Sequence, residues 1–170
     1  MKNQIRYIIM INLFILFSAM LVKAQDEVGI KPLTGEIEFD GLVNEPAWKL
    51  SQELPLAMHF PVFNNPTTEN SEVYLTFDNN YLWVGAILYY KDVDNIVSTS
   101  KKRDEESENS DAFGILLDSY DDNENALAFF TMPSGLKIDY SVSNDGQGGG
   151  PGPGMSSKNY TWNSYWDVKT

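Results

Sequence analysis

Residues 71–90 read SEVYLTFDNNYLWVGAILYY, and this stretch decides the fold class. Residues 72–77 alternate polar-tipped and apolar side chains with the period of two that is typical of a β-strand. The polar residues 78–80 provide a turn, and residues 81–90 run back with apolar side chains on both faces. The stretch therefore predicts a β-hairpin whose return strand either is central in a sheet or carries an aromatic platform on one face.

The same period of two continues on both sides of this hairpin. Short apolar runs at 113–117, 126–132 and 136–142 are separated by clusters of Gly, Pro, Asn and Asp. The helical signal is limited to a short turn at 47–50, which directly follows a proline. Roughly seven or eight short strands with regularly spaced turns predict an all-β protein, namely an antiparallel β-sandwich of jelly-roll type.

The C-terminal part contains one glycine-rich and one aromatic-rich segment. Residues 144–154 include the run GGGPGPG and predict a flexible loop. Residues 160–170 regain strand character, and the sequence then stops without a closing turn, a terminal helix or a polar tail. We therefore expect a sandwich that lacks its last strands.

The composition describes one acidic domain without cysteine. The chain has 170 residues with 24 acidic and 12 basic side chains, which give a net charge of −12. This charge repels phosphate backbones and argues against nucleic-acid binding. The absence of Cys excludes disulfides, thiolate nucleophiles and Cys-ligated zinc, and a single His excludes any site that needs two imidazoles.

The N-terminus has the pattern of a secretory signal peptide. Two basic residues precede the apolar run 7–22, and Ala24 is a small residue suited to cleavage. An uncleaved membrane anchor is the alternative, but the run is shorter than the roughly 20 apolar residues of a spanning helix. We expect a signal peptide at 1–24, a linker at 25–33, and a domain at 34–170 that is exported to the periplasm, the outer membrane or the cell surface of a Gram-negative bacterium.

The residue patterns give little support to catalysis by this chain alone. His59 lies between Met58 and Phe60 with no nucleophile motif near it, so we interpret it as a structural or exposed residue. The acidic loop 104–111 contains carboxylate pairs of the kind that glycoside cleavage needs. A charge-rich solvated loop supplies such pairs by chance, however, so we expect a non-catalytic domain.

A second acidic cluster lies at a turn between two predicted strands. Calcium is a hard cation that takes about six to eight oxygen ligands, and this turn is rich in oxygen-bearing side chains. The spacing is not that of an EF-hand, and a hydrated hairpin tip is the favoured interpretation over a structural calcium ion. The candidate ligands are Asp118, Asp121, Asp122 and Glu124.

Trp162 and Trp166 are four residues apart in a predicted strand, so they face the same side together with Tyr160 and Ser164. Indole rings stack on the apolar C–H faces of sugars, while hydroxyl groups bond to sugar hydroxyls. Packing in the core is the competing interpretation. For this pair, which lies close to the glycine-rich loop, the two interpretations are evenly balanced.

Several motifs follow one another in a recognisable order: FDGLVNEPAW at 39–48, VYLTFD at 73–78, YLWVG at 81–85, the strand Asp111 to Asp118, Phe130 to Gly135, Asp139, and the strand Trp162 to Trp166. In this order they resemble the family 9 carbohydrate-binding modules, in the variant found at the N-terminus of large exported bacterial outer-membrane proteins. The resemblance covers residues 34–170, and its first motif is the most specific.

The resemblance implies a β-sandwich that binds polysaccharides or oligosaccharides, with structural calcium in some members. It also implies attachment to glycoside hydrolases, which hydrolyse O-glycosyl compounds in polysaccharide catabolism. In larger proteins that carry this variant, an outer-membrane β-barrel follows the module.

The sequence departs from the sugar-binding members of that family at the sugar clamp. In those members a Trp in the loop before the Asp111 strand clamps the sugar, and a Glu within the strand contacts the sugar hydroxyls. Alignment on both aspartates places Glu108 and Gly114 at these positions, and the second clamp Trp belongs to a C-terminal loop that this sequence lacks. Asp111 thus carries over, whereas the clamp does not.

Our first hypothesis is an exported, non-catalytic carbohydrate-binding module. The alternative is an interaction or plug domain of a larger outer-membrane β-barrel protein that binds no sugar, and a hydrolase active on its own is the least favoured. The candidate sugar-binding residues are Trp162, Trp166, Asp111, Arg103 and Asn109.

Overall fold

The computed structural model describes residues 28–99, 102–105, 107, 109–147 and 157–170. The chain divides into two compact units, Met1–Ile30 and Lys31–Thr170, and all the β-strands belong to the second unit. The predicted signal peptide at 1–24 and the glycine-rich centre of the loop 144–154 lie outside the described residues. Among the residues described, none of the helices combines the length and the apolar character needed to span a membrane.

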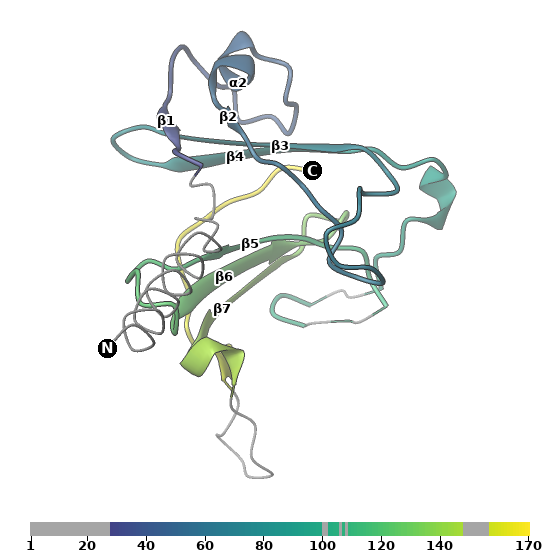
Figure 1. Cartoon of the computed structure of the whole chain (residues 1–170), viewed down its shortest axis with the longest axis vertical. Helices are drawn as coiled ribbons and strands as arrows, with labels where there is room; N and C mark the ends of the chain where they lie inside the picture. The colour runs from purple at the N-terminus through teal and green to yellow at the C-terminus, as the bar shows by residue number, and fades with distance from the viewer. Residues whose placement is uncertain (1–27, 100–101, 106, 108, 148–156) are drawn as a thin grey trace, which may run out of the picture. The chain divides into compact units, whose positions relative to one another are not determined.

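The first sheet is built on the predicted hairpin (Figure 1). Strand β3 (Ser71–Phe77) pairs antiparallel with β4 (Leu82–Leu88) along its whole length. Two short strands complete the sheet, because β2 (Gln52–Glu53) pairs antiparallel with β3 and β1 (Lys31–Pro32) pairs parallel with it. The hairpin is therefore confirmed, and the one parallel pair makes this sheet mixed rather than purely antiparallel.

The return strand of the hairpin is not the central one in the described sheet. Strand β3 is paired with three strands, whereas β4 pairs with β3 alone. The second option, an aromatic platform, agrees with the ring contacts of Trp83, whose centroid lies 5.5 Å from that of Tyr81 and 6.3 Å from that of Phe39. The Trp83 indole N–H also donates a hydrogen bond of 2.8 Å to Asp78, which orients the ring.

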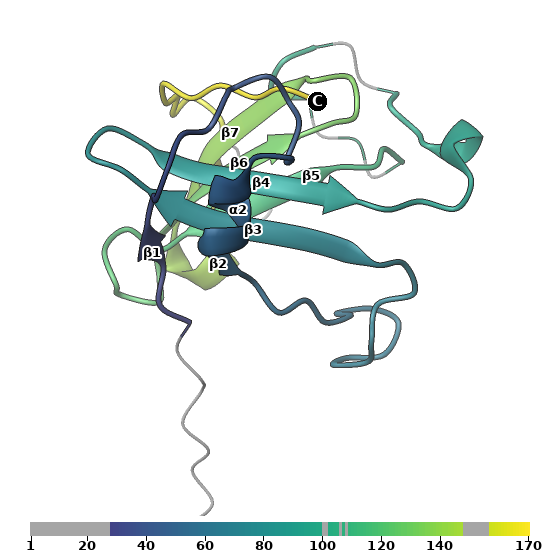
Figure 2. The same cartoon turned by 90° about the horizontal axis from the view of Figure 1, so that it is seen from above.

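Helix α2 (Pro46–Leu50) covers the face of the first sheet that is turned away from the second sheet (Figures 1 and 2). Pro46 lies in the first turn, where a missing N–H costs nothing. Ser51 ends the helix, with its N–H and its hydroxyl both bonded to the Trp48 carbonyl. The buried Trp48 ring packs against Gly85 of β4, so the helix is held by core packing.

The second sheet contains β5 (Phe113–Leu117), β6 (Ala126–Thr131), β7 (Lys137–Val142) and β8 (Lys158–Asn159), all antiparallel in this order. Two 3-10 turns, η1 (Val93–Asn95) and η2 (Asn144–Gly146), lie outside the sheets. Side chains of β6 and β7 alternate between the two faces. One face carries the buried cluster of Ala128, Met132, Ile138 and Tyr140, and the other carries the opposed pair Phe129 and Asp139.

The two sheets lie one above the other as layers, which confirms the predicted all-β, sandwich-like fold (Figure 1). Residues 160–170 were expected to form a strand, but they enter no ladder beyond β8. Their exposure alternates as it would in a strand, and side chains of β7 hold them in place. At their end Lys169 lies against Gly41, where an added Cβ would be 3.1 Å from the Lys169 Cβ.

We expect Gly85→Ala to lower the free energy of unfolding by about 1–3 kcal/mol, because the added methyl group must displace the Trp48 ring. A Cβ at Gly85 would lie 2.9 Å from that ring. Urea denaturation followed by tryptophan fluorescence measures the change. Gly29→Ala is the matched control, since a Cβ at Gly29 meets no atom within 4 Å. Equal stability of the two variants would contradict this account of the helix packing.

Candidate functional site

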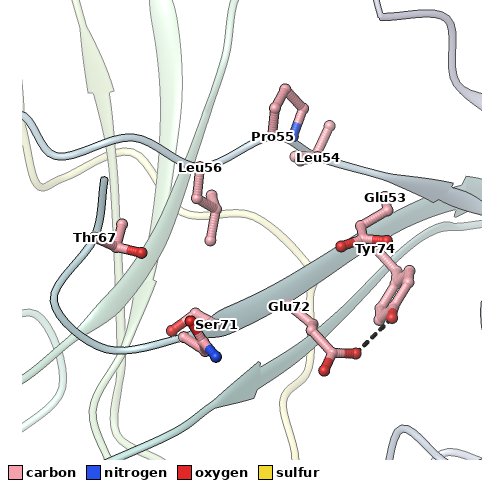
Figure 3. Close-up of a pocket in the computed structure, with 9 residues that line it drawn as sticks. Glu53, Leu54, Pro55, Leu56, Thr67, Ser71, Glu72 and Tyr74 are labelled. Atoms are coloured by element: carbon pink, nitrogen blue, oxygen red, sulfur yellow. Dashed lines mark hydrogen bonds between the residues drawn. The ribbon is translucent and has the colours of Figure 1, made fainter. Parts of the chain in front are cut away.

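An open groove runs along the edge of the first sheet beside β3 (Figure 3). Its volume is about 390 Å³, and it lies between the chain that leaves β2 and the chain that enters β3. Glu72 and Tyr74 reach the groove together because alternate residues of a strand share one face. The lining residues are Glu53, Leu54, Pro55, Leu56, Thr67, Asn70, Ser71, Glu72 and Tyr74.

The Glu72 carboxylate is the centre of the hydrogen bonding in this groove. The Tyr74 hydroxyl donates to one carboxylate oxygen at 2.6 Å, and the Tyr89 hydroxyl donates to the other at 2.9 Å. These bonds, with that of Tyr74 the larger effect, hold the pKa of Glu72 below its ordinary value. In return, the bond to Glu72 raises the pKa of Tyr74 to about 12, and the pKa of Tyr89 is raised for the same reason.

This arrangement suits recognition better than proton transfer. With its pKa lowered, Glu72 is an ionised carboxylate at neutral pH, whereas the acid of a glycosidase needs a raised pKa. In the lining, the Tyr74 phenol oxygen and the Glu72 carboxylate present acceptor lone pairs, and Asn70 and Ser71 add an amide and a hydroxyl. The groove can therefore bind a ligand that carries many hydroxyl groups.

The two tryptophans proposed from the sequence pack against the second sheet. Trp162 and Trp166 share one side of the chain as predicted, and both are half-buried. Each packs edge-on against Phe129 of β6, with centroid distances of 5.8 and 5.5 Å. The Lys137 ammonium lies 5.6 Å from the centre of the Trp166 ring, and the buried Trp166 indole N–H has no hydrogen-bond partner among the described residues. The structure thus uses both rings in packing.

Arg103, another predicted sugar-binding residue, is bound to a buried carboxylate. Its guanidinium forms an ion pair with Asp139, whose side chain is fully buried, and a second with Asp104 at 3.3 Å. The same guanidinium donates to the Asn163 side-chain oxygen at 3.3 Å. The other oxygen of Asp139 accepts the Ser164 N–H at 2.8 Å. Arg103 therefore holds the C-terminal segment to β7.

Asp111 and Asn109 lie in the connection that enters β5. The Asp111 carboxylate accepts the backbone N–H of Val97, and its own N–H donates to the Val97 carbonyl, both at 2.8 Å. Asn109 is exposed. At Gly114, the position that the sequence alignment matched to a glutamate of the family 9 modules, a Cβ would lie 2.2 Å from the Phe130 ring. The position therefore has no room for a longer side chain unless Phe130 moves.

The residues proposed as calcium ligands form a tight acidic turn. The Asp118 carboxylate accepts backbone N–H groups of the turn, chiefly that of Asn123, and these bonds lower its pKa. The Asp122 carboxylate likewise accepts the Asn125 side chain and backbone, with a lowered pKa. The described residues contain no group of three or more His, Cys, Asp or Glu side chains placed to hold a metal. The other two candidates, Asp121 and Glu124, are exposed, and calcium binding stays a prediction.

Sequence reasoning did not single out Glu72, Tyr74 or Tyr89. The alternation of β3 places Glu72 and Tyr74 on one face, and this alternation is the sequence signal that could have indicated them. The approach of Tyr89 depends on the register of the hairpin, in which Ser71 lies opposite Leu88.

No family model, curated protein or solved structure matches the chain.

We expect Arg103→Ala to lower the free energy of unfolding by about 3 kcal/mol, because it leaves the Asp139 carboxylate buried without its cation. Chemical denaturation measures the loss. The control is Lys91→Ala, which breaks an exposed ion pair with Glu69 (3.0 Å) and should cost less than about 1 kcal/mol. Similar losses in both variants would contradict a special role for the Arg103 pair.

The raised pKa of Tyr74 predicts a dependence of stability on alkaline pH. Because the folded state holds this proton more tightly, the contribution is complete below the ordinary value of 10.0 and is lost as the pH rises to about 12. The difference between the phenolate absorbance titrations of the wild type and Tyr74→Phe should have its midpoint at about 12. Circular dichroism, recorded alongside, checks that both proteins are folded over the pH range compared, and a midpoint near 10.0 would show that the bond to Glu72 is not made.

Proposed function

We propose that this protein is a non-catalytic carbohydrate-binding module that holds its ligand in the groove beside β3. The single observation that carries the proposal is the Glu72 carboxylate, held in place by the hydroxyls of Tyr74 and Tyr89 at the groove. A carboxylate whose position is fixed before binding loses little entropy when a ligand arrives. Its remaining lone pairs accept hydrogen bonds from sugar hydroxyls.

The chemistry of the groove supports a neutral, hydroxyl-rich ligand. Glu53 and Glu72 make the lining acidic, which disfavours phosphate and other anions. The apolar side chains of Leu54, Pro55 and Leu56 form the opposite side of the groove and suit the C–H faces of a sugar ring. One polar side and one apolar side match the two kinds of surface that a pyranose presents.

The resemblance to the family 9 modules supports the same ligand class and adds a context. We propose an exported protein that acts in polysaccharide catabolism alongside enzymes that hydrolyse O-glycosyl bonds. In this role the domain keeps a polysaccharide close to a catalytic partner, whereas Glu72, ionised and bonded to two phenols, performs no cleavage itself.

The test is affinity electrophoresis of the purified protein through native gels that contain xylan, laminarin or hydroxyethyl cellulose. We expect retention in at least one gel, and Glu72→Gln should weaken it about tenfold or more, because an ionised acceptor makes the stronger hydrogen bonds. The control is Glu69→Gln, which removes a carboxylate paired with Lys91 outside the groove and should leave retention unchanged. A folded protein that is retained in none of the gels would contradict the proposal and favour the interaction domain.

A further inference from the structure

The chain between β2 and β3 carries an exposed apolar loop next to the groove. We name residues 58–65 the Phe loop. Phe60 and Phe63 are 84% and 77% exposed, and Val62 is 51% exposed. Exposed apolar side chains gathered in one place usually mark a contact site, because each costs free energy in water. The His59 ring, which is also exposed, packs edge-on to Phe63 at 6.0 Å.

Backbone hydrogen bonds hold the Phe loop in one shape. The Met58 N–H donates to the Asn65 carbonyl, and the Asn64 N–H donates to the Met58 carbonyl, both at 2.8 Å. The Asn65 N–H closes the tip by donating to the Val62 carbonyl at 3.3 Å. The exposed rings are therefore presented by an ordered loop, which lowers the entropic cost of using them in binding.

The two stems of the Phe loop form the walls of the groove. Residues 54–56, which lead into the loop, line one side of the groove, and Thr67 and Asn70, which follow it, belong to the lining as well. Because the residues that line the groove directly flank the Phe loop in the sequence, a ligand held beside Glu72 lies close to the loop. No charged residue occurs between Glu53 and Glu69, so the loop offers neither attraction to an anionic lipid surface nor a charged partner for a protein.

We propose that the Phe loop is a stacking subsite for one ring of a polysaccharide whose neighbouring units occupy the groove. This inference rests on the proposed carbohydrate binding and extends it, because it makes the ligand a chain of several neutral pyranose units and not a single sugar. The C–H face of a pyranose packs on an aromatic ring as other apolar surfaces do, and exposed Phe60 and Phe63 supply such rings. The groove orients the chain by hydrogen bonds, and the loop adds contact area beyond it.

The test compares ligands of different length by isothermal titration calorimetry. The ligands are the two-unit and six-unit oligosaccharides of the polysaccharide that retains the wild type among xylan, laminarin and hydroxyethyl cellulose. We expect the double variant Phe60→Ala/Phe63→Ala to bind the six-unit ligand about tenfold more weakly and the two-unit ligand within about twofold of the wild type. Glu72→Gln should weaken binding of both lengths.

The matched control is Tyr120→Ala, which removes an exposed aromatic ring (74%) outside the groove and the Phe loop and should change neither affinity. Because both phenylalanines are exposed, the double variant should unfold at the same temperature as the wild type. Unchanged binding of the six-unit ligand by the double variant would overturn the subsite while leaving the groove proposal intact. The same conclusion would follow if the double variant kept its affinity for the ligand and instead lost binding to phosphatidylcholine vesicles. A folded wild type that binds no ligand would overturn both proposals.

Discussion

The C-terminal half of the structure depends on the ion pair and hydrogen bonds of the buried Asp139 carboxylate. A carboxylate without solvent must be paired and hydrogen-bonded, or the cost of burying it exceeds what the fold can supply. Arg103 provides the cation, and the Ser164 N–H binds the second oxygen. The Asp139 backbone N–H in turn donates to the Asp104 carboxylate at 3.2 Å. One residue of β7 thereby joins a loop and a C-terminal segment that no sheet ladder holds.

This constraint also decides which parts of the molecule are available to a ligand. Because the C-terminal segment is drawn against β7, Trp162 and Trp166 meet Phe129 and contribute to packing. The charge of Arg103 is compensated inside the same network. The Glu72 carboxylate differs from that of Asp139, since it is held by neutral phenols beside an open groove and not by a buried ion pair. The first sheet is therefore the better place for recognition.

The local parts of the fold could be predicted from the sequence. The alternation of residues 72–77 and the polar turn after them define a hairpin, because both signals act between neighbours in the chain. The place of β4 in its sheet was harder to predict. Its sequence has apolar residues on both faces, but this pattern does not show whether a helix, a strand or an aromatic ring covers each face. In the same way, the spacing of Trp162 and Trp166 predicted a shared side but not which partner that side meets. The groove was not predicted from the sequence, because Tyr89 reaches Glu72 only in the register that the folded hairpin adopts.

The connection between β2 and β3 explains why the Phe loop lies beside the groove. The two strands are direct neighbours, with Glu53 opposite Tyr74, yet residues 54–70 separate them in the chain. The connection must therefore leave the sheet and return to the same edge, so its two stems run close together and form the walls of a groove. Both ends are anchored by the ladder, and the Leu54 N–H extends it with a 2.8 Å bond to the Val73 carbonyl. Since the tip contributes little to the core, exposed phenylalanines there cost the fold little beyond their own hydration. The loop that we propose for binding can therefore vary in sequence without loss of the sheet that anchors it.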